Sequence, residues 1–389
     1  MPLALLLVAC SSFGLGDGLA PKLAPDADAT PAADTASDDA TEAIDHPTES
    51  TEDSGEIDIP PDDTAAEVEP PPDDPSARGP YAVGVKTVEL WDDTRWRSIP
   101  VEVWYPIDPS APDGSPNTYE IEILGLKVYE MATDAHRDAT PLSGPWPAVM
   151  FSHGYGGIRF QSYFLTEHLA SHGFVVVAPD HMGNTLMEPW NLGSDEAALQ
   201  SSIDRPLDLS FALDALLDGE LGVEADPARV GLTGHSFGGW ASIQTPLVDD
   251  RFVATFPMAP GFKETAHPTD SAGLGIPFLV IGGSVDATCE FDENQLATYD
   301  AAKDPRYLVR VEGAGHLDFS NLCEVEMAKM FIDDGCNPDS IDPLTVQARA
   351  KTLGTTFAKV YIAGDNRYSS LLDESAVTAL GNVTYWRDP

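Results

Sequence analysis

Six uninterrupted apolar runs constrain the fold of this chain more than any other feature of its sequence. Between residues 146 and 316 they read "WPAVMFSHG", "GFVVVAPD", "RVGLTGHS", "FVATFPMAP", "IPFLVIGGSVD" and "RYLVRVEGAGH". Helix-length segments such as "QSYFLTEHLASHG" and "RPLDLSFALDALLDG" lie between them. Strands that are apolar on both sides and alternate with helices form parallel sheets covered on both faces. The sequence therefore predicts an α/β fold, with a mostly parallel central sheet and a ligand site beyond the carboxyl ends of its strands.

The chain divides by composition. Residues 10–79 are rich in Asp, Glu, Pro, Ala, Ser and Thr and carry 19 acidic against two basic side chains. Such a stretch cannot bury enough apolar area to offset chain entropy, so we expect a disordered acidic linker. We therefore predict a signal segment at 1–9, this linker at 10–79 and one folded domain at 80–389. The net charge of −43 argues against a nucleic-acid partner, because phosphate binding requires clusters of Lys and Arg.

The N-terminus, "MPLALLLVACSS", is a short apolar run that resembles the lipobox of bacterial lipoproteins. Small residues before Cys10 suit a signal peptidase, and the Cys10 thiol would carry the lipid. The run is too short to span a bilayer and lacks a basic start. We expect an exported lipoprotein of a bacterial cell envelope, anchored to the membrane by lipid, with the acidic segment as its tether.

Three further cysteines, Cys289, Cys323 and Cys336, would lie in an oxidising space after export. A disulfide between Cys323 and Cys336 is favoured because it closes a short local loop, while pairing of Cys289 with Cys323 stays open. No C-x-x-C spacing supports a zinc site. We expect no metal site.

Side chains with catalytic chemistry lie at the ends of several apolar runs. Ser236 follows "RVGLTGH", Asp286 follows "FLVIGGSV" and His316 follows "YLVRVEGAG". A serine hydroxyl is a weak nucleophile at neutral pH and needs a base that is itself oriented by an acid. The chain order serine, aspartate, histidine is that of the α/β-hydrolase arrangement. We therefore predict Ser236 as nucleophile, His316 as base and Asp286 as acid.

The turn around Ser236 also predicts an oxyanion hole made of backbone N–H groups. Glycines at 234, 238 and 239 suit a sharp strand-to-helix turn, which would aim the amide of Phe237 at the reacting carbonyl. The second donor should come from the loop "SHGYGGIRF", where the amide of Tyr155 follows His153 and Gly154. His153 itself is given no catalytic role.

The motifs "FSHGYGG", "LASHGFVVVAPDH", "TGHSFGG" and "GAGHLDFS" resemble the platelet-activating factor acetylhydrolase and dienelactone hydrolase-like branch of the α/β-hydrolases. The resemblance runs from about residue 81 to about residue 325. It implies a cofactor-free serine esterase with the triad and oxyanion donors above, acting on a small-molecule, lipid or polymer ester. Cutinases and bacterial polyester hydrolases share the same sharp turn around the serine, so the resemblance does not identify the substrate. Dienelactone hydrolases proper use a cysteine nucleophile, and Ser236 departs from them.

Several alternatives stay open. A peptidase or amidase could use the same triad, and a surface binding lipoprotein could retain a catalytically dead hydrolase fold. Glu290, Asp292 and Glu293 could supply the acid or bind calcium, although the loop that carries them is expected to be solvated. His267 lies in the wrong place for the chain order.

Two other segments are candidates for lining the pocket. Asp180 and His181 lie at a strand end and would either line the pocket or shape the loop. The insertion Ile107–Pro145 would either cover the pocket or pack against the domain's own sheet.

Overall fold

The computed structural model of this chain describes residues 73–388, apart from 124–125, 189, 192, 262–267, 326–333 and 337–339. Cys10, the expected signal segment, most of the expected linker and His267 therefore lie outside the described residues. Within the described part, a single sheet has eleven strands in the order β11-β10-β9-β8-β7-β5-β6-β2-β1-β4-β3. The strands are β1 (Ala82–Asp92), β2 (Arg97–Ile107), β3 (Ser115–Ile123), β4 (Leu126–Arg137), β5 (Trp146–Ser152), β6 (Val175–Pro179), β7 (Ala225–Gly234), β8 (Phe252–Thr255), β9 (Phe278–Gly283), β10 (Arg306–Val311) and β11 (Val383–Asp388).

The six apolar runs form the parallel centre of this sheet. They become β5 to β10, and each neighbouring pair among them runs parallel. The two strands before the insertion form the antiparallel hairpin β1–β2, which joins the centre through the pairing of β2 with β6. The last strand, β11, pairs antiparallel with β10. The prediction of an α/β fold with a mostly parallel sheet is confirmed.

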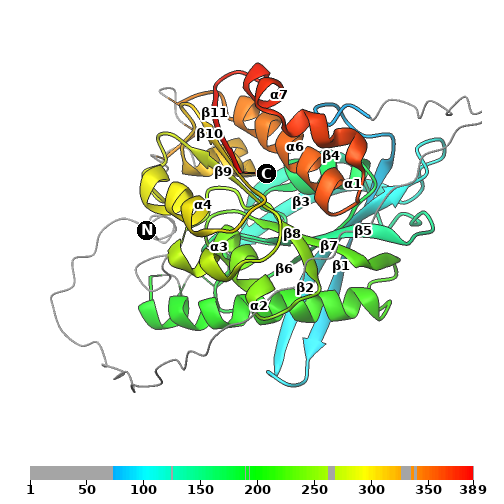
Figure 1. Cartoon of the computed structure of the whole chain (residues 1–389). Coiled ribbons are helices and arrows are strands. Elements are labelled where there is room, and N and C mark those ends of the chain that lie inside the picture. Colours follow the sequence, from blue (N-terminus) through cyan, green and yellow to red (C-terminus); the bar gives the residue numbers. More distant parts are fainter. Residues whose placement is uncertain are drawn as a thin grey trace, which may run out of the picture. The chain divides into compact units, whose positions relative to one another are not determined.

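Helices cover both faces of the sheet because successive side chains of a buried strand point to opposite sides. On β5, Val149 and Phe151 pack with residues of α1 (Tyr163–Ser171) and α6 (Pro343–Tyr361). Ala148 and Met150 pack with residues of α2 (Asp195–Leu217) and α3 (Phe237–Gln244). Figure 1 shows α1 and α6 on one side of the sheet and α2 on the other. Two short helices, α4 (Ala297–Ala301) and α7 (Glu374–Ala379), complete the described α-helices near β10 and β11.

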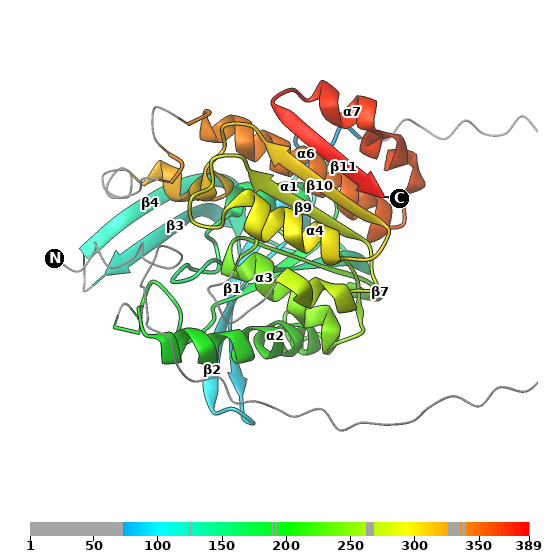
Figure 2. The same cartoon turned by 60° about the vertical axis from the view of Figure 1, so that its left-hand side comes forward.

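The insertion between β2 and β5 forms the antiparallel hairpin β3–β4, which adds to the sheet beside β1. Figure 2 shows the two strands side by side as a long bent hairpin. Tyr119, Ile121 and Tyr129 are buried in the core cluster that includes α1. The structure therefore favours packing as the role of these apolar side chains.

Residues 73–79 correct the expected boundary of the linker. Pro75 is buried, and its carbonyl oxygen lies 2.9 Å from Nε2 of His168 on α1. The carbonyl of Ala77 lies 3.0 Å from Nε2 of His172. The amide of Gly79 donates to Ser171 Oγ at 3.0 Å. These backbone partners fix a segment whose composition alone indicates disorder, so the packed part of the chain begins before residue 80.

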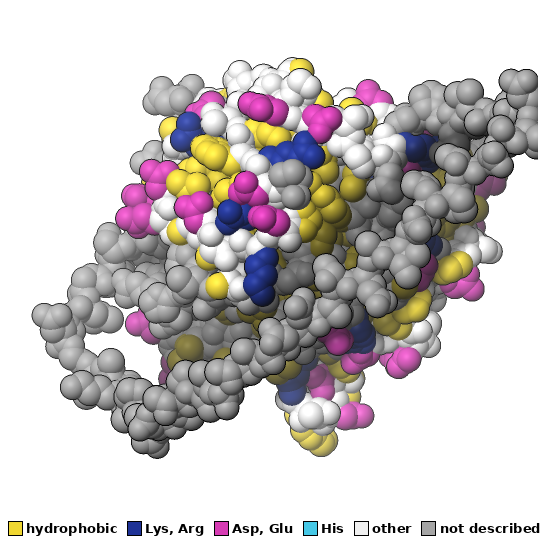
Figure 3. Space-filling view, viewed as in Figure 1, with side chains coloured by type: hydrophobic (Ala, Val, Ile, Leu, Met, Phe, Trp, Pro, Cys, Tyr) yellow, Lys and Arg dark blue, Asp and Glu magenta, His cyan; other side chains and the backbone are white. Residues whose placement is uncertain are grey.

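Charged side chains of both signs are interspersed with apolar ones on the face of the described residues that Figure 3 shows. On β10 and β11, Arg306 pairs with Asp388, Arg310 with Glu312, and Arg387 with Asp373. Among the described helices, none is both long enough and apolar enough to cross a membrane.

Candidate active site

Ser236 lies at the turn between β7 and α3 in a backbone conformation that residues other than glycine rarely adopt. Its φ is +58° and its ψ is −124°. Such a conformation costs of order 1–3 kcal/mol and persists only where the surroundings hold it. Here the Ser236 amide donates to the Met258 carbonyl at 3.0 Å, and the Ser236 carbonyl accepts from Trp240 N at 3.0 Å. These two hydrogen bonds hold the backbone on both sides of the serine, at the start of α3.

The glycines around Ser236 allow the close backbone contacts of this turn. A Cβ atom on Gly238 would lie 1.9 Å from the carbonyl oxygen of Ser152, and one on Gly234 would lie 2.4 Å from the carbonyl oxygen of Gly238. A Cβ atom on Gly239 would approach Pro260 Cα to 3.0 Å. Side chains at the first two positions would collide with backbone, which explains why the sequence has glycine there.

His316 and Asp286 meet beyond the ends of β10 and β9. Nδ1 of His316 lies 2.8 Å from Oδ2 of Asp286, and both residues are buried. Oδ1 of Asp286 accepts from the amides of Thr288 and Cys289 at 3.0 and 2.7 Å. Burial raises the pKa of the Asp286 carboxyl, and the neighbouring His316 opposes that rise. Asp286, rather than the alternatives Glu290 and Asp292, holds this ring nitrogen.

His235 brings the histidine loop next to the serine. Nε2 of His235 lies 2.9 Å from the carbonyl oxygen of His316, and the two rings are 4.7 Å apart. Nδ1 of His235 lies 2.8 Å from Nε2 of Gln161. Burial lowers the pKa of His235 well below its usual value, so its ring is neutral at neutral pH. Since His235 precedes Ser236, this buried chain of contacts joins the serine turn to the His316 loop.

A short segment at 334–336 clamps the same loop, and sequence reasoning missed it. One Asp334 carboxylate oxygen accepts from the His316 amide at 2.9 Å. The other accepts from the Ala287 amide at 3.1 Å and from the Thr288 hydroxyl. Asp334 therefore ties the loop of Asp286 to the loop of His316.

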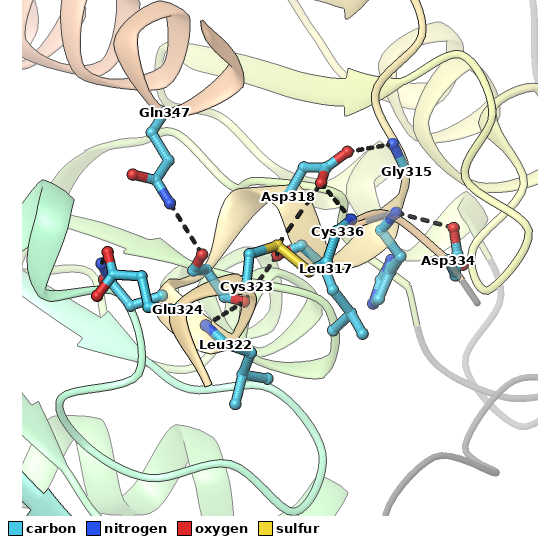
Figure 4. Close-up of a disulfide and its surroundings, with 12 residues drawn as sticks. Gly315, Leu317, Asp318, Leu322, Cys323, Glu324, Asp334, Cys336 and Gln347 are labelled. Carbon is cyan, nitrogen blue, oxygen red and sulfur yellow. Dashed lines mark hydrogen bonds between the residues drawn. A yellow bond between two sulfur atoms is a disulfide. The ribbon is translucent and has the colours of Figure 1, made fainter. Parts of the chain in front are cut away.

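The disulfide Cys323–Cys336 attaches this segment to the residues after His316 (Figure 4). This is the pairing favoured by the short separation, and Cys289 lies buried outside it. Asp318 accepts from the amides of Gly315 and Cys336, both at 2.8 Å. The only sequence signal for the clamp is that Asp334 stands two residues before a cysteine with a predicted local partner.

The loop after β5 lies beside Ser236. A Cβ atom on Gly154 would lie 3.5 Å from Cβ of Ser236. The amides of Gly154, Gly156 and Gly157 donate to protein oxygens at 3.0, 3.3 and 3.1 Å. The amide of Tyr155 donates to no acceptor in the described part of the chain. The Tyr155 ring lies 6.2 Å from the ring of Phe237, the other predicted donor.

A second serine, histidine and aspartate are arranged in line beneath this loop. Ser152 Oγ lies 2.8 Å from Nε2 of His181, and Nδ1 of His181 lies 2.9 Å from Oδ2 of Asp208. Ser152 has no exposed surface, and its hydroxyl also accepts from Arg205 at 3.1 Å. A nucleophile needs access to substrate and a free lone pair. This arrangement is therefore structural, and it gives His181 the loop-shaping role rather than the pocket-lining one.

Asp180 has a similar supporting role. It pairs with Arg159, which donates to Asp180 Oδ2 at 2.7 Å and also reaches Glu102 at 3.1 Å. Burial raises the pKa of Asp180, and the Arg159 guanidinium opposes that rise.

A serine at a strained turn after β7 and a histidine–aspartate pair after β10 and β9, all at the carboxyl ends of parallel strands, fit the α/β-hydrolase fold. The chain belongs to the PET hydrolase-like family, whose model matches residues 137–334, just over half of its length. It is 27% identical over 198 residues to cutinase est2 of Thermobifida alba, a match that covers 48% of this chain and 60% of that protein. It is 24% identical over 308 residues to a platelet-activating factor acetylhydrolase of Cavia porcellus, covering 63% and 68%.

The fold is also similar to that of a solved ferulic acid esterase from Streptomyces cinnamoneus. The TM-score is 0.65 at 24% sequence identity, and the match covers 79% of this chain and 97% of that one. At this identity the likeness concerns the fold. The sequence match to the cutinase spans less than two thirds of that relative.

Proposed function

We propose that this protein hydrolyses carboxylic esters with Ser236 as the nucleophile. The Ser236 hydroxyl attacks the ester carbonyl carbon while His316 accepts its proton, and Asp286 orients and stabilises the resulting imidazolium. The amides of Tyr155 and Phe237 donate to the oxyanion of the tetrahedral intermediate. Collapse expels the alkoxide, which takes the proton from His316 and leaves an acyl-enzyme. Water, deprotonated by His316, then attacks the acyl-enzyme, and the Ser236 oxygen takes the proton back from His316 as the acid is released.

One observation carries this proposal: Ser236 is held at positive φ next to the loop of Tyr155. The Tyr155 amide donates to no acceptor in the described part of the chain, while the neighbouring amides of the loop donate hydrogen bonds to protein oxygens. The buried contact between His316 and Asp286, at 2.8 Å, supports the base and the acid. The family assignment, the cutinase relative and the acetylhydrolase relative favour ester substrates.

A fluorophosphonate tests the nucleophile. It should label Ser236 alone and abolish hydrolysis of p-nitrophenyl esters, and Ser236→Ala should lose several orders of magnitude in kcat. Asp286→Asn should lose about 10³- to 10⁴-fold in kcat, because the ring would no longer be held in the right tautomer. Asp292→Asn, in the same acidic loop, is the matched control. Normal turnover by Ser236→Ala would place the chemistry elsewhere.

A chain-length series of p-nitrophenyl esters, with matched anilides, should then define the substrate class. Faster cleavage of anilides than of esters would favour the amidase alternative, and neither turnover nor labelling would favour a binding protein. The shortened protein should begin at or before residue 73, since residues 73–79 pack on α1.

We also propose that Cys10 carries a lipid and that the acidic segment tethers the enzyme to a membrane. The support is the sequence "LVAC" followed by a long acidic stretch. Mass spectrometry of the native N-terminus should find a lipid-modified cysteine, and Cys10→Ala should release the protein from membranes without changing turnover. Recovery of unmodified protein from the cytosol would contradict the anchor.

A further inference from the structure

Arg205 lies fully buried on α2, beneath the loop that carries Tyr155. Its guanidinium donates to the carbonyl of His153, to the carbonyl of Gly154 at 3.1 Å and to Asn184 Oδ1 at 2.8 Å. It also donates to the hydroxyls of Ser152 and Ser201, both at 3.1 Å. Its donors are thus directed at neutral oxygens, most of them on or under one loop.

The carbonyl of Gly154 belongs to the same peptide unit as the amide of Tyr155. A trans peptide is planar, and its C=O and N–H point in opposite directions. Holding the Gly154 oxygen from below therefore fixes the direction of the Tyr155 N–H above. Nδ1 of His153, at 2.7 Å, and the Gly157 amide, at 3.1 Å, meet the same oxygen.

Arg205 also contacts the second predicted donor. Its guanidinium lies 4.3 Å from the centre of the Phe237 ring. Asn184 Oδ1 accepts from Arg205 and from the Gly156 amide, so the next peptide of the loop is held through the same cation. A single side chain thus touches the loop of Tyr155 and the residue after Ser236.

The charge of Arg205 has an electronic consequence for that peptide. Burial lowers the pKa of Arg205 to about 9, so the group stays protonated at neutral pH. A cation that donates to a peptide carbonyl polarises the peptide and strengthens its N–H as a donor, because hydrogen bonds in series reinforce one another. In a buried site of low dielectric this effect is larger than in water.

From this geometry we propose that Arg205 is a positioning residue for oxyanion stabilisation, aiming and polarising the Tyr155 amide without touching substrate. The inference rests on the proposed esterase function. Part of the transition-state stabilisation given by the loop of Tyr155 would then depend on a residue of α2.

Arg205→Met tests this inference in the full chain, with Arg229→Met as the matched control. Arg229 pairs with Asp226 near the start of β7, at the opposite end of the strand from Ser236. Removing one oxyanion donor typically costs about 10²- to 10³-fold in kcat. Since Arg205 acts through the peptide, we expect a loss of about 10- to 100-fold in kcat for a p-nitrophenyl ester, with KM changed less than about threefold. Arg229→Met should keep the wild-type rate.

A pair of inhibitors separates positioning from general structural support. An alkyl trifluoromethyl ketone forms a tetrahedral oxyanion with the serine, whereas the matching secondary alcohol does not. Arg205→Met should lose affinity for the ketone by the same factor as kcat/KM and keep its affinity for the alcohol. Equal losses for both ligands, or an unchanged kcat in a folded variant, would overturn the inference.

Arg205→Lys keeps the test decisive if the Met variant does not fold. A lysine retains the charge but not the planar fork, so a smaller loss with the same preference for the ketone is expected. A stable Lys variant with equal losses for ketone and alcohol would overturn the inference. If the wild type neither hydrolyses esters nor reacts with a fluorophosphonate, the proposed function itself fails. A fully active Arg205→Met would contradict only the positioning role.

Discussion

At the scale of single residues, the backbone conformation of Ser236 lowers the stability of the fold, while the hydrogen bonds of its backbone raise it. The positive φ of Ser236 strains the chain, while its amide and carbonyl are both hydrogen-bonded. Glycine has no Cβ and adopts positive φ without that cost. The strain therefore arises because this position carries a side chain, and the proposed chemistry requires that side chain.

This strain predicts an order of stability among variants at position 236. Ser236→Ala keeps the Cβ atom and the strain, whereas Ser236→Gly relieves it. After allowing for the greater freedom of glycine in the unfolded chain, Ser236→Gly should be more stable than Ser236→Ala by about 1 kcal/mol. Urea denaturation measures the difference, and loss of ester turnover in both variants is the internal control. An Ala variant as stable as the Gly variant would show that the turn is not strained.

At the scale of elements, the hairpin β3–β4 is built into the core through Tyr119. The Tyr119 ring stacks between Phe160 at 5.0 Å and Tyr163 at 4.9 Å. Its hydroxyl accepts from Trp104 Nε1 at 2.6 Å and donates to Glu167 at 2.8 Å. A hairpin held in this way behaves as part of the domain rather than as a detachable cover.

Tyr119→Phe should therefore reduce stability while leaving turnover nearly unchanged. The change removes one oxygen, leaves the buried Trp104 N–H without its acceptor and leaves Glu167 Oε1 with the Thr133 hydroxyl, at 2.8 Å, in place of two donors. We expect a cost of about 2–3 kcal/mol. Tyr81→Phe is the matched control, because no described residue accepts from or donates to the Tyr81 hydroxyl. Chemical denaturation and ester turnover, measured on both variants, check the prediction. A shift in acyl-chain preference without loss of stability would instead indicate a hairpin that contacts substrate.

The disulfide belongs to the same scale because it fixes the clamp on the His316 loop. Cys323 and Cys336 are 13 residues apart, and closing a loop of this size is worth about 3 kcal/mol in the chain-entropy account. Replacing both cysteines by serine should lower stability by about 2–3 kcal/mol. It should also reduce kcat, since Asp334 would no longer be tied to the His316 amide. Parallel measurements on Asp334→Asn, with the disulfide intact, separate the clamp from the crosslink. Unchanged kcat in both variants would remove the clamp from the mechanism.

At the scale of the whole molecule, buried neutral histidines make stability depend on pH. Burial, with a smaller contribution from His172, lowers the pKa of His168 from 6.5 to about 3. Between these two values the unfolded chain binds a proton that the folded chain does not. Stability from this group is therefore fully present above pH 6.5 and is lost as pH falls towards 3.

His168→Gln should weaken that dependence. The loss of unfolding free energy between pH 7 and pH 5 should be smaller in the variant than in the wild type by about 1–2 kcal/mol. Denaturation at the two pH values gives the difference, and His136→Gln, a half-buried histidine on β4, controls for the loss of an imidazole as such. An identical pH dependence in His168→Gln and wild type would contradict a depressed pKa.

The sequence by itself determined the sheet centre, the turn at Ser236 and the favoured disulfide, because each depends on local pattern. Continuous apolar runs are buried wherever they occur, glycines at 234 and 238 permit close backbone contact, and Cys323 and Cys336 are near each other along the chain. The motifs that resemble the α/β-hydrolases indicated the same strand ends and the same turn at Ser236. Residues 73–79 show the limit of composition, since buried partners on α1 order a segment that looks disordered.

Only the tertiary structure decided which side chains support those predicted for the site. Arg205 meets Gly154 across 51 residues of sequence, and Asp334 meets the His316 amide across 18. No local pattern encodes such contacts, because they depend on how α2 and the segment of Asp334, which follows β10, pack against the ends of the strands. Burial then sets their strength: the same arginine on an exposed helix face would be screened by water, whereas beneath the Tyr155 peptide its charge acts on one buried bond.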